Sequence, residues 1–129
     1  TAALQKNLGT LLMQSVSSYD TIGENFYHGL VLGLCATLDN RFYITSNRES
    51  GEGRYDICLC PKDGKLPGIL IELKAAKDCP EDELKELSEK ALAQIDSRKY
   101  ETELTVKGVR NILKYGVAFS GKRVMITSA

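Results

Sequence analysis

Two acidic residues and one lysine stand out in residues 54–74, because they interrupt segments that are otherwise apolar. Asp56 lies in RYDICLC, and Glu72 and Lys74 lie in GILIELK. Acids that meet in a half-buried sheet repel each other unless a positive charge lies between them. Lys74 is one candidate for that charge, and a divalent cation is the better one. These residue types therefore indicate a metal site with a lysine beside it.

The chemistry of such a site suits phosphodiester hydrolysis. A hard cation such as Mg²⁺ takes carboxylate oxygens as ligands and keeps several waters. It can activate one of those waters and polarise a phosphoryl oxygen. Lys74 lies two residues beyond Glu72, on the same face of the strand and about 7 Å along it. It could orient the attacking water or stabilise charge that develops on the phosphate.

Whether the two carboxylates meet depends on the register of a predicted hairpin. Residues 55–60 and 68–74 read as its strands, with PKDG in the turn between them. A loop centred on Gly64 pairs Asp56 with Glu72, since each lies eight residues from it. A slip of one residue would turn one carboxylate to the other face. Both strands have an apolar second face, which predicts that both are sandwiched between layers.

Three further polar residues could belong to the same site. Glu24 could add a third carboxylate, although its spacing from Thr21 also fits the capping box of a helix N-terminus. Gln94 lies at the edge of the apolar stripe of a predicted helix, where it either needs buried hydrogen-bond partners or reaches solvent. His28 faces the same side of its helix as Glu24. It is left out of the catalytic set, because a lone helical histidine is more often packed or solvent-facing than a ligand.

The elements that would position these residues follow from hydrophobic periodicity, capping patterns and turn signals. No internal repeat and no low-complexity run interrupts them. The predicted order is helix 3–16, helix 21–37, strand 41–46 with NRESGEG as the following turn, strands 55–60 and 68–74, helix 80–97 with Pro80 at its first position, and one or two closing strands in NILKYGVAFS and KRVMITS, split at Ser120 and Gly121. This order predicts a mixed sheet with helices on both sides, an α/β or α+β domain.

Composition and charge narrow the classes of function. The net charge is zero, so the global balance indicates neither nucleic-acid nor membrane binding. From Arg98 to the end, seven Lys and Arg face two acids, which predicts either a basic C-terminal surface or only a solvated rim. The four cysteines form no CxxC pair and there is one histidine, so free thiols are expected rather than zinc ligands.

Length and segment types predict the organisation of the chain. At 129 residues it fits a single domain over residues 1–129. It has no signal peptide and no apolar run near 18 residues, which predicts a cytoplasmic protein. Because the first residue is threonine, we expect the domain to be the C-terminal part of a longer protein, although processing would look the same.

Four segments, taken together, resemble a known group of enzymes. They are ENFYHGLVLGL, SNRESGEGRYD, IELK and QIDSRKY, in that order along the chain. Their sequence and order resemble the PD-(D/E)XK nuclease superfamily, and within it a branch of prokaryotic proteins with an ATPase-like N-terminal region. The resemblance runs from about residue 20 to residue 126. The chain departs from the superfamily pattern at Tyr55, which replaces the proline that names the group.

The resemblance implies a restriction-endonuclease-like core of αβββαβ order, here with an extra N-terminal helix. It also implies a cofactor, Mg²⁺ or Mn²⁺, held by Asp56 and Glu72. Lys74 would assist catalysis, Glu24 would complete the acidic cluster, and Gln94 would line the site from the following helix.

Two further residues of QIDSRKY match the family, Lys99 and Tyr100, as structural residues or as contacts to the nucleic-acid backbone. The implied partner is nucleic acid, with DNA as the expected substrate and no membrane. An ATPase-like region of the full-length protein is a candidate partner. A homodimer is compatible with the pattern, but nothing in the sequence requires one.

The expected function is a Mg²⁺- or Mn²⁺-dependent nuclease that hydrolyses phosphodiester bonds in DNA by in-line attack of an activated water. Two alternatives stay open, because one fold can host several roles. The domain could be a catalytically silent module that binds nucleic acid or protein, although the presence of Lys74 argues against this. It could also be active only within a larger ATP-dependent assembly. The sequence does not distinguish DNA from RNA, or endonuclease from exonuclease action.

Overall fold

A single five-stranded sheet organises the chain in the computed structural model, with strand order β1-β2-β3-β4-β5. The structure describes residues 5–6, 9–10, 24–36, 40–49, 54–63, 65–95, 104–106 and 108–129. The elements are α2 (Glu24–Ala36), β1 (Phe42–Glu49), β2 (Arg54–Pro61), β3 (Gly68–Ala75), α3 (Glu81–Ala93), β4 (Ile112–Ser120) and β5 (Arg123–Ser128). β3 and β4 are parallel and the other neighbours are antiparallel, so the predicted mixed sheet is confirmed.

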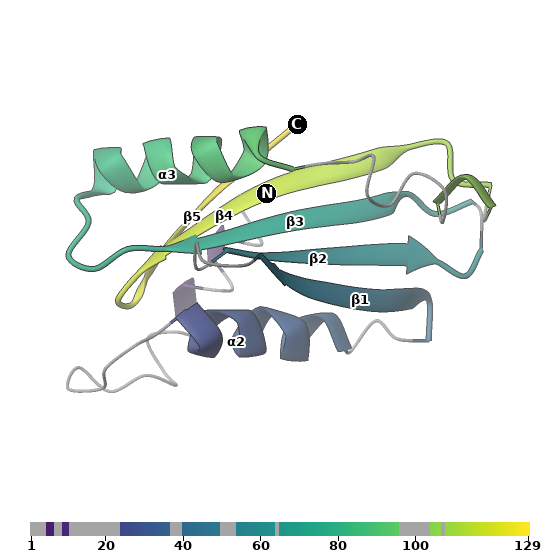
Figure 1. Ribbon diagram of the computed structural model, residues 1–129, viewed down its shortest axis with the longest axis horizontal. Helices are drawn as coiled ribbons and strands as arrows, with labels where there is room; N and C mark the ends of the chain where they lie inside the picture. Colours follow the sequence, from purple (N-terminus) through teal and green to yellow (C-terminus); the bar gives the residue numbers. More distant parts are fainter. Residues whose placement is uncertain are drawn as a thin grey trace.

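The two helices cover opposite faces of the sheet, as Figure 1 shows. On one face, Val31 of α2 belongs to a core cluster with Ile57 and Phe119. On the other face, Leu84 of α3 packs with Ala118 of β4. Successive strand residues point to opposite faces, and both faces are covered, which explains why the central strands are almost continuously apolar. The predicted sandwiching of the two central strands is confirmed.

The first strand is longer than predicted. Residues 47–49, which the sequence assigns to a turn, continue β1 and pair with residues 54–56 of β2. β1 pairs only with β2 in the sheet order, so it is an edge strand. An edge strand tolerates polar residues, because side chains on an edge can reach solvent. Polarity alone was therefore the wrong signal for the end of β1.

The boundaries of α3 differ from the prediction at both ends. Pro80 is the N-cap, with ψ of 157°, and the first helical residue is Glu81. The extended ψ places the proline just before the helix instead of at its first position, while the predicted acidic first turn is confirmed. The helix ends at Ala93, with Gln94 as its C-cap, before the predicted end near residue 97. No helix among the described residues is long and apolar enough to cross a membrane.

Two short helical segments complete the described chain. Residues 5–6 and 9–10 are helical, in agreement with the helix predicted over residues 3–16, whose other residues lie outside the described ranges. Residues 104–106 form a helical turn, where the sequence predicts no helix or strand. Leu104 in this turn is buried and packs with Cys58 and Leu70.

The four cysteines are buried free thiols, as predicted. Burial raises the pKa of Cys35 from 9.0 to about 11. A folded pKa above the unfolded value means that the thiol's contribution to stability is complete below about pH 9 and is lost as the pH rises toward 11. We expect the free energy of unfolding, measured by urea denaturation, to fall over this range.

The matched variant for this prediction is Cys35→Ala, which should show a smaller fall. Tyr27 supplies part of the remaining decrease, because burial raises its pKa. Equal pH slopes in the two proteins would contradict the role of the Cys35 thiol.

Candidate active site

The predicted pairing of two carboxylates is present in the sheet. Asp56 of β2 lies directly opposite Glu72 of β3, in the predicted register. Directly opposed residues have Cβ atoms about 4.5–5.5 Å apart, so the two acids adjoin. Lys74 lies two residues farther along β3 and therefore projects from the same face. The hairpin thus brings two acids and a lysine into one patch of the sheet.

This patch lies on the face that α3 covers. Glu72 pairs with Gly116 on its other side, in β4. A Cβ atom added to Gly116 would lie 2.1 Å from the carbonyl oxygen of Ser88 and 2.4 Å from the nitrogen of Leu92. The backbone of α3 therefore rests directly on β4, beside Glu72, which only a residue without a side chain allows.

The three charged residues differ in burial. Glu72 is only 1% exposed, while Asp56 and Lys74 are partly exposed. Each of the three takes part in a hydrogen bond, ion pair or other electrostatic interaction, as a buried carboxylate requires. β4 and α3 enclose Glu72, so the patch is reached from the side of Asp56 and Lys74. An enclosed acid beside an accessible acid and a lysine suits a site that receives a cation and an anionic substrate.

Comparison with known protein families decides the membership of the chain. A family model described as the PD-(D/E)XK nuclease superfamily matches residues 22–129, which is more than half of the chain. The chain belongs to the PD-(D/E)XK nuclease superfamily. Comparisons with curated proteins and with solved structures give no match. The mixed sheet with helices on both faces is consistent with the restriction-endonuclease-like fold that the resemblance implies.

Gln94 lies on the same side of the sheet as the acidic pair of this PD-(D/E)XK domain. It is the C-cap of α3, and its Oε1 atom is buried. The next residue, Ile95, packs against Cys58 and Leu70. Cys58 lies two residues after Asp56 and Leu70 two residues before Glu72, so both share a face of the sheet with the acidic pair. The end of α3 therefore lies beside the acidic pair, and the role of Gln94 in lining the site stays a prediction.

Glu24 lies on the helix that covers the opposite face. It is the first residue of α2, and its side chain lies outside what the structure describes. One turn later, Tyr27 stacks on Phe119, with ring centroids 4.5 Å apart. Phe119 pairs with Ala75, the residue after Lys74. The start of α2 thus lies at the end of β3 that carries Lys74, and the role of Glu24 as a third carboxylate stays a prediction.

Other predictions fall outside the described part of the chain. Lys99 and Tyr100, predicted as backbone contacts, lie in residues 96–103, and Thr21, the predicted cap of α2, also lies outside it. The roles of these three residues stay predictions.

The donor set fits a hard divalent cation. PD-(D/E)XK nucleases generally use divalent metals, and Mg²⁺ is usually held by one or two carboxylates, with waters and substrate phosphates as its other ligands. Asp56 and Glu72 supply two such carboxylates from adjacent positions. Among the residues whose side chains the structure describes, no group of three or more His, Cys, Asp or Glu could hold a metal. Asp56 and Glu72 therefore stay the predicted ligands.

Sequence reasoning missed the contribution of Gly116. This glycine brings α3 onto β4 and so encloses Glu72. A signal for it exists, because a glycine inside the apolar segment KYGVAFS marks a bulge or a close approach of another backbone.

Proposed function

We propose that this PD-(D/E)XK domain is a metal-dependent nuclease that hydrolyses phosphodiester bonds in DNA, with Mg²⁺ or Mn²⁺ as its cofactor. The observation that carries the proposal is the direct pairing of Asp56 with Glu72, with Lys74 on the same face. Two carboxylates side by side in a covered sheet repel each other, and a bound cation would relieve that repulsion. A lysine beside them suits an anionic substrate.

Each residue of the site has a role in this proposal. Asp56 and Glu72 bind the cation, with the enclosed position of Glu72 fixing one ligand and the accessible position of Asp56 leaving an approach for the substrate. When bound, the cation lowers the pKa of a coordinated water and polarises the phosphoryl oxygen. Lys74 stabilises negative charge that develops on the phosphate. Gln94 orients groups from the end of α3, and Glu24 adds a third carboxylate.

The test is a calorimetric titration of Mn²⁺ into the wild type and into Asp56→Asn, followed by incubation of both with plasmid and linear DNA. Asparagine keeps the shape of the side chain and removes its charge, so we expect metal affinity at least about ten-fold weaker, with DNA cleavage reduced along with it. Asp82→Asn is the control, because Asp82 is exposed on the first turn of α3. This variant should bind metal as the wild type does.

A wild type that binds no Mn²⁺, even with DNA present, would overturn the proposal. The acidic pair would then be structural, and the domain a binding module. A wild type that binds metal but cuts only with other components added would instead indicate an enzyme that works in a larger assembly. The homodimer, the ATPase-like region, the cytoplasmic location and the single domain within a longer protein stay predictions.

A further inference from the structure

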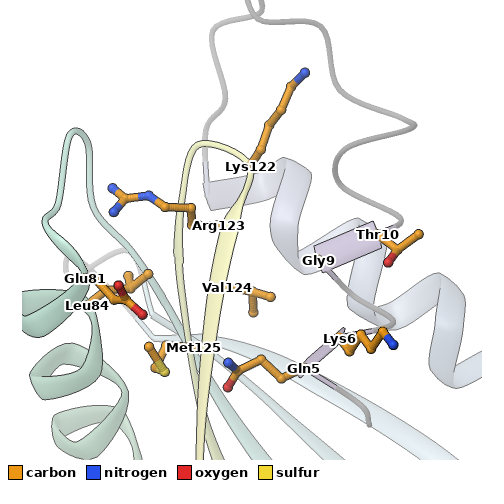
Figure 2. A pocket seen from close by; sticks show the side chains of 10 residues that line it. All are labelled: Gln5, Lys6, Gly9, Thr10, Glu81, Leu84, Lys122, Arg123, Val124 and Met125. Atoms are coloured by element: carbon orange, nitrogen blue, oxygen red, sulfur yellow. The ribbon is translucent and has the colours of Figure 1, made fainter. Parts of the chain in front are cut away.

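A groove lies around strand β5, on the flank of α3 away from Asp56 and Glu72. Its volume is about 420 Å³, within the range of ligand sites. Leu84, Val124 and Met125 supply its apolar lining. Figure 2 shows Val124 and Met125 on β5 between the N-terminal helical segment and the start of α3. The groove is thus built by three segments that lie far apart in the sequence.

The rim of the groove is mainly cationic. Lys6, Lys122 and Arg123 line it, and Glu81 supplies the one carboxylate among its lining residues. Lys122 and Arg123 belong to the C-terminal region in which basic residues outnumber acids. An excess of two positive charges in a groove attracts an anionic ligand.

The directions of the three cationic side chains indicate the shape of that anion. In Figure 2, Lys6 and Arg123 point to opposite sides of the groove, while Lys122 projects outward from the β4–β5 turn. A small anion would need cations that converge on one point. Cations spread around a groove can each meet a different charge of an extended polyanion, and a nucleic-acid backbone repeats one charge about every 3.4 Å along each strand.

The groove lies near Lys74, through residues that pair across neighbouring strands. Lys74 of β3 pairs with Ala118 of β4, and Ala118 pairs with Met125 of β5, which lines the groove. Two strand spacings, about 10 Å, therefore separate Lys74 from Met125. Along the axis of a duplex, this is the rise of about three phosphates of one strand. One nucleic-acid strand could contact both places around the N-terminal end of α3.

We propose that this groove, lined by Lys6, Lys122 and Arg123, binds the phosphate backbone of the nucleic-acid substrate a few nucleotides away from the scissile bond. The proposal rests on the proposed nuclease function. It assigns the binding of substrate to a surface on the far flank of α3 from Asp56 and Glu72. The sequence region that is rich in basic residues then serves substrate binding and is more than a solvated rim.

Arg123 also has a structural task, so the test uses the two lysines. Its Nη2 group donates hydrogen bonds to the Cys79 carbonyl and to Ser120 Oγ, which in turn accepts a hydrogen bond from the Cys79 backbone N–H. These bonds tie the loop before α3 to the end of β4. Replacing Arg123 would disturb that loop as well as the groove, whereas Lys6 is exposed and Lys122 partly exposed.

The experiment compares the wild type with a Lys6→Ala, Lys122→Ala double variant by fluorescence anisotropy on a labelled DNA duplex, with Ca²⁺ replacing Mg²⁺ to prevent cleavage. We expect about ten-fold weaker binding. The slope of log affinity against log salt should become shallower by about 2, because two phosphate contacts are lost. In cleavage assays with Mg²⁺, KM should rise while kcat stays unchanged. Lys65→Ala is the control, because Lys65 lies at the β2–β3 turn, in the separate groove it shares with Arg110.

Three outcomes would overturn the proposal. If the double variant keeps its affinity, salt slope and cleavage, the groove does not bind the substrate, while the proposed nuclease function still holds. An equal loss in Lys65→Ala would show diffuse electrostatic attraction in place of a defined path. A wild type that neither binds nor cleaves DNA would contradict both the proposed nuclease function and the proposed role of the groove. Circular dichroism melting of each variant checks that it is folded.

Discussion

Lys74→Ala should bind Mn²⁺ as the wild type does and cleave DNA about 100- to 1,000-fold more slowly. This is the loss that follows when one preorganised donor to developing charge is removed from an active site. Lys74 is not a carboxylate and supplies no metal ligand, so its removal separates charge stabilisation from metal binding. The measurements are calorimetric titration of Mn²⁺ and single-turnover cleavage with metal and enzyme in excess.

Lys77→Ala is the matched control for this variant. Lys77 is exposed in the loop three residues after Lys74, so its removal takes away one positive charge near the same end of β3. It should leave cleavage within a few-fold of the wild type. If Lys74→Ala instead lost metal binding as well as cleavage, the lysine would be holding the acidic pair together and would not be acting on the phosphate.

Gly116→Ala should destabilise the domain by about 3 kcal/mol, at the upper end of the usual cost of overpacking. The new methyl group would meet backbone atoms of α3 at Ser88 and Leu92, and backbone cannot rotate away as a flexible side chain can. Either α3 shifts or the strand does. Both movements disturb the enclosure of Glu72, which pairs with Gly116. Urea denaturation measures the loss.

Gly33→Ala is the control for the same chemical change. Gly33 is exposed on α2, and an added Cβ atom there meets nothing within 4 Å. Alanine in an exposed helix is more favourable than glycine by up to about 1 kcal/mol, so this variant should be slightly more stable than the wild type. Wild-type stability in Gly116→Ala would mean that α3 lies farther from β4 than the structure places it.

The hairpin of the site could be predicted from the sequence because local rules determine it. A short turn sets the register, and alternation then decides which side chains share a face. Asp56 and Glu72 needed only these two rules. The order of the elements predicted a mixed sheet but did not say which strands pair in parallel. The resemblance to the family then implied roles that spacing alone left open, and these roles stay predictions.

Other features depend on contacts that hydrophobic periodicity and turn signals do not reveal. The enclosure of Glu72 depends on Gly116, which lies 44 positions later in the chain. The extent of β1 depends on the pairing partners that β2 offers, and not on the polarity of residues 47–49. Leu104 reads as part of a polar stretch, but it is buried against Cys58 and Leu70. Gly116 and Leu104 have partners far away in sequence, whereas residues 47–49 pair with a nearby strand but show no apolar alternation.

Because β3 pairs in parallel with β4, the site combines contacts between residues near in sequence with contacts between residues far apart in sequence. β1, β2 and β3 follow one another through short connections, so the contact between Asp56 and Glu72 is local in sequence. The cover over Glu72 comes from α3 and β4, and β4 pairs with β3 only after the long crossover between Ala75 and Ile112. Closing a long loop costs more conformational entropy than closing a short turn. The larger entropy cost therefore belongs to the docking of α3 and β4 over Glu72. The pairing of Asp56 with Glu72 does not depend on how β4 docks.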